Sequence, residues 1–220
     1  MIILGIDVGG TFTDLVLHDA QTGQLRSLKT PTTPPAFADG VLNAISNTGL
    51  PAGEIGSIVH GMTVATNTAL EMNGARLGVI TTRGFRDVLI VGRGNRTQLY
   101  DIKAVRPPPL VERARVLEVD ERITATGEVY LPLNNDHVAS ACEQLMDEGV
   151  EAIAICFLHS YANPDHERRA AKIVQRALPN IPVSISSNIL PEYREFERFS
   201  TTALNAYVGP KVSQYLGRLS

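Results

Sequence analysis

The sequence predicts an α/β protein, in which a mixed β-sheet flanked by helices is accompanied by a second, smaller α/β part. Two apolar, β-branched runs within residues 2–17 flank a short Gly-Gly-Thr-Phe-Thr turn, the pattern of two antiparallel strands joined by a tight loop. Strand and helix patterns alternate further along the chain, which requires a sheet covered by helices. The continuous apolar run at 152–158 is typical of a strand covered on both faces.

The first part of this architecture is expected over residues 1–82. A third strand at 24–30 completes a meander, and helical spacing of apolar residues follows from Phe37. A short strand at 58–59, a helix at 64–73 and a strand at 77–81 then predict a parallel crossover that packs on the opening meander.

The remainder of the chain is expected to fall into three stretches. Residues 83–132 show no regular strand or helix pattern and are predicted to be an insertion. A short hairpin of 116–119 and 128–131 is expected to close it. Residues 133–193 return to α/β alternation, with Asn134 or Asn135 capping a helix. Residues 194–220 read as the start of a long helix.

Charged side chains in these stretches have structural interpretations. Glu192, Glu195 and Arg198 lie three residues apart, a spacing at which helical side chains form surface ion pairs. Four arginines of the irregular stretch could converge on an anion, but side chains of this kind usually face water, and we assign them no catalytic role: Arg83, Arg86, Arg93 and Arg96.

The loop that follows the first strand is suited to holding phosphate. Gly9 and Gly10 are expected to take positive φ and to bring backbone N–H groups close to an anion, and Thr11 and Thr13 add hydroxyl donors. Asp7 ends an apolar strand, where burial is costly unless a cation such as hydrated Mg²⁺ pairs with it. The alternative is a plain hairpin, whose glycines only shape the turn and whose aspartate caps it.

Composition argues against several classes of function. The chain has 220 residues, 44% hydrophobic and 20% charged, and a net charge of −3 with scattered basic residues, so we expect neither a nucleic acid nor a membrane as partner. The start of the sequence shows no signal-peptide pattern, which makes the cytoplasm the default location. Cys142 and Cys156 read as two buried thiols. The five dispersed histidines lack the spacing of a transition-metal site.

Five motifs resemble those of the hydantoinase A/5-oxoprolinase family, in the family's order and over nearly the whole chain. The opening loop by itself also resembles the first phosphate loop of the sugar kinase, Hsp70 and actin superfamily, which implies an RNase H-like lobe of the actin-like ATPase type. The five motifs cover residues 5–14, 60–67, 84–89, 158–167 and 190–198.

The resemblance implies an ATP- and Mg²⁺-dependent enzyme that phosphorylates an unreactive carbonyl oxygen of a cyclic amide before hydrolysis. Asp7 would orient Mg²⁺ and act in catalysis. The residues that would hold the nucleotide are Gly9, Gly10, Thr11, Thr13, Thr63, Thr66 and Asn67, the last three at a helix N-terminus. Helix capping is the alternative role for those three. A second lobe would follow Ser220, so that this chain is an N-terminal lobe.

Other functions stay open at this stage. A subunit of an acetone or acetophenone carboxylase would show bicarbonate dependence and a ketone substrate. A sugar kinase shares the Gly-Gly-Thr loop. A non-catalytic domain would serve to bind a partner, for example a hydantoinase B-type subunit, and an oligomer is expected in any of these cases.

Overall fold

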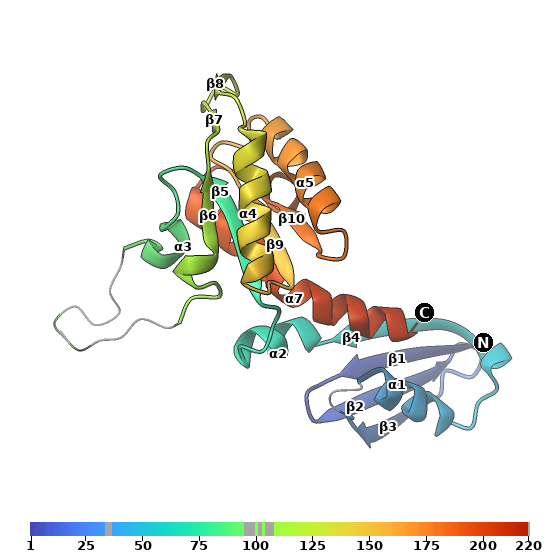
Figure 1. Ribbon diagram of the computed structural model, residues 1–220. Helices are drawn as coiled ribbons and strands as arrows, with labels where there is room; N and C mark the ends of the chain where they lie inside the picture. Colours follow the sequence, from blue (N-terminus) through green and yellow to red (C-terminus); the bar gives the residue numbers. More distant parts are fainter. Residues whose placement is uncertain (34–36, 95–99, 101–102, 104–107, 220) are drawn as a thin grey trace. The chain divides into compact units, whose positions relative to one another are not determined.

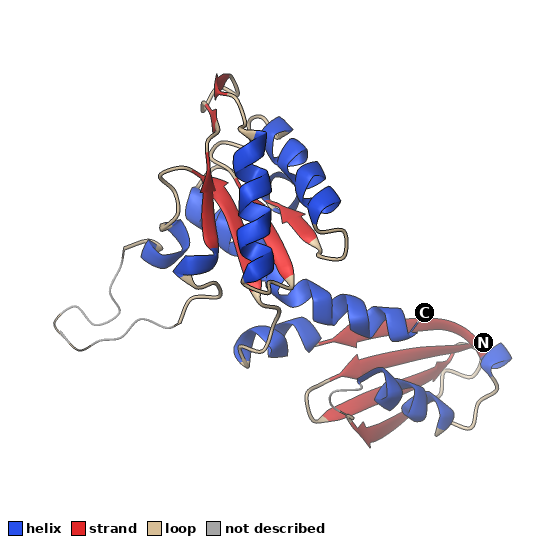
Figure 2. Cartoon of the chain, in the orientation of Figure 1, coloured by secondary structure: helices blue, strands red, loops and turns tan. Residues whose placement is uncertain are grey.

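The structure is a computed structural model that describes residues 1–33, 37–94, 100, 103 and 108–219. The chain divides into two compact units, one of Met1–Asn73 with Lys211–Ser220 and one of Gly74–Pro210. Each unit is a β-sheet with helices packed on it, so the predicted α/β class is confirmed (Figures 1 and 2). Parts of the predicted 83–132 insertion, at 95–99, 101–102 and 104–107, lie outside the described residues.

The sheet of the first unit has the strand order β3-β2-β1-β4. The predicted meander is confirmed, because β1 (Ile2–Val8), β2 (Phe12–Asp19) and β3 (Leu25–Pro31) pair antiparallel in sequence order. After the short 3-10 helix at Ala52–Glu54, β4 (Ile55–Met62) pairs parallel to β1 and makes the sheet mixed.

Alternate residues of β1 and β2 form the core of the first unit. One sheet face carries fully or almost fully buried aliphatic side chains, which α1 (Phe37–Ser46) covers in Figure 1. Val64, the first residue of α2 (Val64–Leu70), joins the same cluster. The buried aliphatic residues of the two strands are Leu4, Ile6, Val8, Leu15 and Leu17.

The sheet of the second unit consists of four parallel strands in the order β10-β9-β5-β6. Its strands are β5 (Leu77–Thr82), β6 (Val116–Val119), β9 (Ala152–Cys156) and β10 (Val183–Ile185).

Two sequence-based expectations about strand pairing are wrong. β5 does not pack on the opening meander, because it pairs with β9 and β6 and all six of its residues are buried. β6 does not form a hairpin with 128–131. That hairpin instead joins β7 (Arg122–Ile123) and β8 (Val129–Leu131). A parallel strand takes its neighbour from across the fold, so sequence proximity does not identify it.

Helices cover both faces of this parallel sheet. On one face, α4 (Asn135–Asp147) and α5 (Asp165–Ala177) pack together, and Asn134 caps α4 through its side-chain oxygen, as predicted. On the other face lie α3 (Val88–Val91) and the residues of α7 (Glu195–Leu219) that belong to this unit. The unit also contains a 3-10 helix at Arg113–Arg115 and the short helix α6 (Ser186–Ile189).

The expected surface ion pairs of Arg198 are wrong. Arg198 is fully buried in α7, and Glu192 precedes that helix. The Arg198 guanidinium donates to the carbonyl oxygens of Glu192 (2.8 Å) and Phe157 (3.0 Å) and to the hydroxyl of Ser186 (3.1 Å). A buried cation therefore joins α7 to the ends of two strands.

Three of the four arginines of the irregular stretch contact other protein groups. Arg83 forms an ion pair with Asp120, and Arg93 donates to Glu197 at 2.6 Å. Arg86 donates to the carbonyl oxygen of Arg113 at 2.9 Å. Arg96 lies outside the described residues. Arg83 and Arg93 are exposed, as expected of side chains that face water, whereas Arg86 is half-exposed. The absence of a catalytic role remains a prediction.

Both cysteines are buried free thiols, as predicted, and burial raises the pKa of Cys142 and Cys156 above the ordinary value. Among the described residues, no helix combines the length and the apolar character needed to cross a membrane. The division of the sequence into 1–82, 83–132, 133–193 and 194–220 remains a prediction.

Candidate functional site

The β1–β2 loop is held in place by its own backbone and by one side chain from beyond β3. The N–H of Gly9 donates to the carbonyl oxygen of Phe12 at 2.9 Å, which closes the hairpin. Thr32 donates through its N–H to the carbonyl oxygen of Thr11 (2.9 Å) and through its hydroxyl to that of Gly9 (3.0 Å). The loop is therefore fixed at both ends.

The glycines of the loop are needed for space, and the expected positive φ is wrong: neither Gly9 nor Gly10 lies in that region. A Cβ on Gly9 would lie 3.0 Å from the carbonyl oxygen of Phe12. A Cβ on Gly10 would lie 3.1 Å from the side-chain nitrogen of Asn67. Close approach of neighbouring groups, one of the standard uses of glycine, explains both positions.

Asp7 is exposed, so its carboxylate does not incur the cost of burial that would have required a cation beside it. Its cross-strand neighbours are Gly61 on β4 and Asp14 on β2. The lack of a side chain on Gly61 leaves room for the carboxylate, since a Cβ there would be 3.5 Å from Oδ1 of Asp7. Asp14 forms an ion pair with Lys29 at 3.3 Å, whereas none of the described residues donates to the Asp7 carboxylate.

These features of Asp7 suit a magnesium ligand. Mg²⁺ prefers oxygen ligands and is usually bound by one or two carboxylates together with substrate phosphates, while keeping several waters. An exposed carboxylate without a protein donor, next to a loop that presents backbone N–H groups, satisfies that requirement. Within the described part of the chain, no group of three or more His, Cys, Asp or Glu side chains could form a closed metal site.

The two threonines of the loop lie in different environments. Thr11 is exposed, and among the described residues no acceptor is found for its N–H or for that of Gly10. Thr13 is fully buried and its hydroxyl lies 3.2 Å from that of Thr32. Thr11 and Gly10 therefore face outward with free donors, while Thr13 lies underneath the loop.

The start of α2 is connected to the end of β1 through side chains. Thr63 donates through its hydroxyl to the carbonyl oxygen of Val8 at 3.0 Å, and Asn67 donates to that hydroxyl at 3.3 Å. Thr63 is the N-cap residue of α2, the position that the capping alternative gives it, but its side chain makes no cap hydrogen bond. Thr66 is exposed on α2 and lies apart from this chain of contacts.

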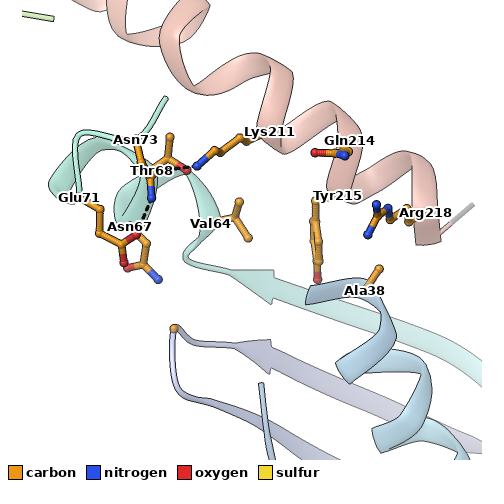
Figure 3. Close-up of a pocket in the computed structure, with 11 residues that line it drawn as sticks. Ala38, Val64, Asn67, Thr68, Glu71, Asn73, Lys211, Gln214, Tyr215 and Arg218 are labelled. Atoms are coloured by element: carbon orange, nitrogen blue, oxygen red, sulfur yellow. Dashed lines mark hydrogen bonds between the residues drawn. The ribbon is translucent and has the colours of Figure 1, made fainter. Parts of the chain in front are cut away.

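A cavity of about 170 Å³ adjoins the loop within the first unit (Figure 3). Gly10 and Asn67 form part of its wall, and Ala38, Val64 and Tyr215 supply apolar surface. Figure 3 shows Lys211 bonded to Asn73 (2.6 Å), which in turn donates to Glu71 (2.7 Å). These three residues line the cavity together with Thr68, Gln214 and Arg218. The cavity thus combines an apolar wall with cationic and amide groups.

His60 and Tyr215 form a second polar contact beside this cavity. The Tyr215 hydroxyl lies 2.6 Å from Nε2 of His60, and burial raises the pKa of Tyr215 to about 12. Burial also lowers the pKa of His60, against the opposing effect of the negative charge of Asp7. Nδ1 of His60 is buried and has no partner among the described residues. Burial therefore disfavours the charged form of this imidazole.

The structure thus brings together most of the residues chosen from the sequence. Asp7, Gly9, Gly10, Thr11, Thr63 and Asn67 meet where β1 and β4 end, whereas Thr66 lies outside the group and Thr13 below it. Sequence reasoning missed Thr32, His60 and Tyr215. His60 belongs to a motif quoted for the family resemblance, but no local pattern connects Thr32 or Tyr215 to the loop.

Gly10→Ala is expected to lower the free energy of unfolding of the first unit by about 1–3 kcal/mol, because the new methyl group displaces the Asn67 amide. Urea unfolding followed by amide resonances of β1 measures this change. Gly53→Ala is the matched control, since its Cβ would meet nothing within 4 Å. Equal effects of the two substitutions would contradict the close packing of Gly10 against Asn67.

The fold is that of an α/β lobe of the actin-like ATPase type. A model of the hydantoinase/oxoprolinase N-terminal region matches residues 3–178. The chain belongs to the hydantoinase/oxoprolinase family.

Relatives cover almost the whole chain. A protein of Methanocaldococcus jannaschii is 42% identical over 216 residues, which is 97% of this chain and 32% of the relative. The caprolactamase subunit alpha of Pseudomonas jessenii is 34% identical, over 98% of this chain and 32% of the subunit. A nucleotide-free acetone carboxylase structure matches with a TM-score of 0.88 and 31% identity, over 99% of this chain and 34% of that chain. The chain therefore spans about a third of the length of these relatives.

Proposed function

We propose that the β1–β2 loop binds the phosphates of ATP and that the protein uses ATP to open a cyclic amide. The observation that carries this proposal is the exposed Asp7 carboxylate, which has no donor among the described residues and lies beside a loop with two free N–H groups. Backbone N–H groups of Gly10 and Thr11, with the Thr11 hydroxyl, would contact phosphate oxygens. Asp7 would hold Mg²⁺, which neutralises charge on the phosphates.

The chemistry follows from the difficulty of hydrolysing an unactivated amide. The ring carbonyl oxygen would receive the γ-phosphoryl group of ATP, which turns that oxygen into a leaving group. Water would then add to the carbonyl carbon and the C–N bond would break, with the ring nitrogen taking up a proton, which leaves an acyl phosphate. A second water would hydrolyse this acyl phosphate and release phosphate. The net products are ADP, phosphate and the ring-opened amino acid. The role of this chain is to bind and orient the phosphates.

Other residues have supporting roles in this proposal. Gly9, Thr13 and Thr32 would keep the loop rigid, and Thr63 with Asn67 would fix the neighbouring start of α2. Thr66 lies outside this group of residues, and its predicted contact with the nucleotide remains a prediction. The cavity beside Gly10 offers space next to the phosphates for another part of a ligand.

A second subunit is part of the proposal. The caprolactamase relative is itself named as a subunit, and the hydantoinase B-type protein is the partner that the family resemblance implies. The complete protein would bind the cyclic amide substrate. This chain spans about a third of the length of the relatives.

The test measures phosphate release from Mg-ATP by the complete protein with its partner subunit. We expect a cyclic amide, tested as caprolactam, hydantoin and 5-oxoproline, to stimulate release and to yield the ring-opened product in equal amount. Stimulation only by a ketone together with bicarbonate would instead identify a carboxylase. No stimulation by any of these compounds, with ATP still bound, would overturn the proposed reaction.

A further inference from the structure

The carboxyl edge of the parallel sheet in the second unit gathers a group of polar residues that the phosphate site does not use. The chain leaves β5 toward β6 on one side and leaves β9 toward β10 on the other, so the connections diverge between β5 and β9. In open α/β sheets, ligands bind outside the carboxyl ends of the strands at such a switch point. In Figure 1 this edge is the one that carries β7 and β8.

His159 is held at this point in an unusual conformation. It follows β9 with φ of 58°, a left-handed value that is uncommon for residues other than glycine. Such conformations persist where the surrounding structure imposes them, and they cluster at functional sites.

Hydrogen bonds fix both residues that precede His159. The N–H of Phe157 donates to Glu167 (2.9 Å) and its carbonyl oxygen accepts from Arg198 (3.0 Å). The N–H of Leu158 donates to the hydroxyl of Thr82 (2.8 Å) at the end of β5. The helices α5 and α7 and the end of β5 thus hold the chain just before His159, whose side chain is half-buried.

The environment of His159 disfavours the charged form of its imidazole and places a hydroxyl beside one ring nitrogen. Burial, followed by the positive charges of Arg198 and Arg122, lowers the pKa of His159, while Glu195 opposes them. The Tyr161 hydroxyl lies 3.4 Å from Nδ1, and the two rings meet edge to face at 5.8 Å. When that hydroxyl donates to Nδ1, the proton resides on Nε2, which becomes a donor. None of the described residues forms a hydrogen bond with Nε2.

Arg122 supplies a second free donor group. Its guanidinium lies 5.0 Å from the ring centre of Phe85, the side chain that follows β5. None of the described residues forms an ion pair or hydrogen bond with this guanidinium. Arg198 differs, since it is fully buried and its donors are engaged by the protein. Arg122 is thus the cation available to a ligand.

We propose that Arg122 and His159 form a second ligand site, which binds the carboxylate of a small molecule. The planar guanidinium fork matches two carboxylate oxygens, and the Nε2–H of a neutral imidazole adds one more donor. Glu195 places a negative charge nearby, which favours a singly charged carboxylate over a dianion such as phosphate. The site is independent of the phosphate loop and requires no nucleotide.

The test is an NMR titration of the protein, labelled in its histidine rings, at pH 7 and constant ionic strength. Sodium acetate, inorganic phosphate and neutral acetamide serve as probes. We expect acetate to shift the His159 ring resonances saturably, with phosphate weaker and acetamide without effect. Arg122→Gln is expected to weaken acetate binding about tenfold or more, and Arg122→Lys to weaken it less.

Controls separate this site from general effects of charge. Arg83→Gln, at the same edge but on an arginine already paired with Asp120, is expected to leave acetate binding unchanged. Amide spectra report whether each variant is folded. Stronger binding of phosphate than of acetate, equal binding by Arg122→Gln and the unchanged protein, or no shift with acetate would each overturn the proposal.

Discussion

Replacing Asp7 with asparagine is expected to lower the rate of Mg-ATP turnover by the complete protein on the order of 100-fold or more, since loss of even an outer partner of a metal ligand costs about 10–100-fold. Asparagine keeps the size of the side chain and one oxygen but removes the negative charge that, in the proposed site, would hold Mg²⁺. Folding should be unaffected, because Asp7 is exposed and no described residue donates to its carboxylate. Phosphate release measures the rate of turnover, and calorimetric titration of Mg-ATP measures the affinity for the nucleotide.

Asp14→Asn is the matched control for this experiment. Asp14 lies directly opposite Asp7 on β2 and is also exposed, but its carboxylate already pairs with Lys29 at 3.3 Å. The same chemical change one strand away should leave turnover within a few-fold of the unchanged protein, on the scale of about 0–1 kcal/mol for an exposed ion pair. Equal losses in the two variants would show that overall charge, rather than Asp7, sustains the activity.

Arg198→Met is expected to destabilise the second unit by about 3–5 kcal/mol, the usual cost of removing one partner of a buried charged network. The guanidinium reaches the buried Glu167 through Ser186, whose hydroxyl donates to Glu167 at 2.6 Å. Methionine has similar bulk but would leave the carbonyl oxygens of Phe157 and Glu192 without their donor. Glu167 would then remain fully buried without a compensating cation.

Hydrogen exchange of the β9 amides under increasing urea measures this effect within the second unit. Arg194→Met is the matched control, because Arg194 is exposed four residues earlier, and it is expected to change stability by less than about 0.5 kcal/mol. Equal protection of β9 in the two variants would contradict the structural role given to Arg198.

Local patterns in the sequence predicted most elements of the fold and the place of the candidate site. The β-branched runs around Gly9 and Gly10 identified the opening hairpin, and the apolar run at 152–158 identified a strand covered on both faces. The helix cap at Asn134 could be predicted because an N-cap side chain accepts hydrogen bonds from residues two or three positions later in the chain. Features of this kind depend on neighbours in the chain.

Local sequence patterns did not predict how distant segments pair. β5 follows the first sheet in sequence but belongs to the second, where it pairs with β9 from 75 residues later. Periodicity shows that a strand is buried, but it does not show which strand lies beside it. The same limit explains why β6 was assigned to the wrong hairpin.

The sequence by itself therefore determined the class of fold and the family, since both rest on residue types at short spacing. The phosphate-binding role of the Gly-Gly-Thr loop is a prediction from the same kind of pattern. Only the tertiary structure decided that Asp7 is exposed, that Arg198 is buried and that Thr32 and Tyr215 belong to the site. Burial and hydrogen bonding depend on which surfaces meet after the chain folds. An aspartate in an apolar strand or an arginine in a charged run can take either environment, and the packing of the other elements decides between them.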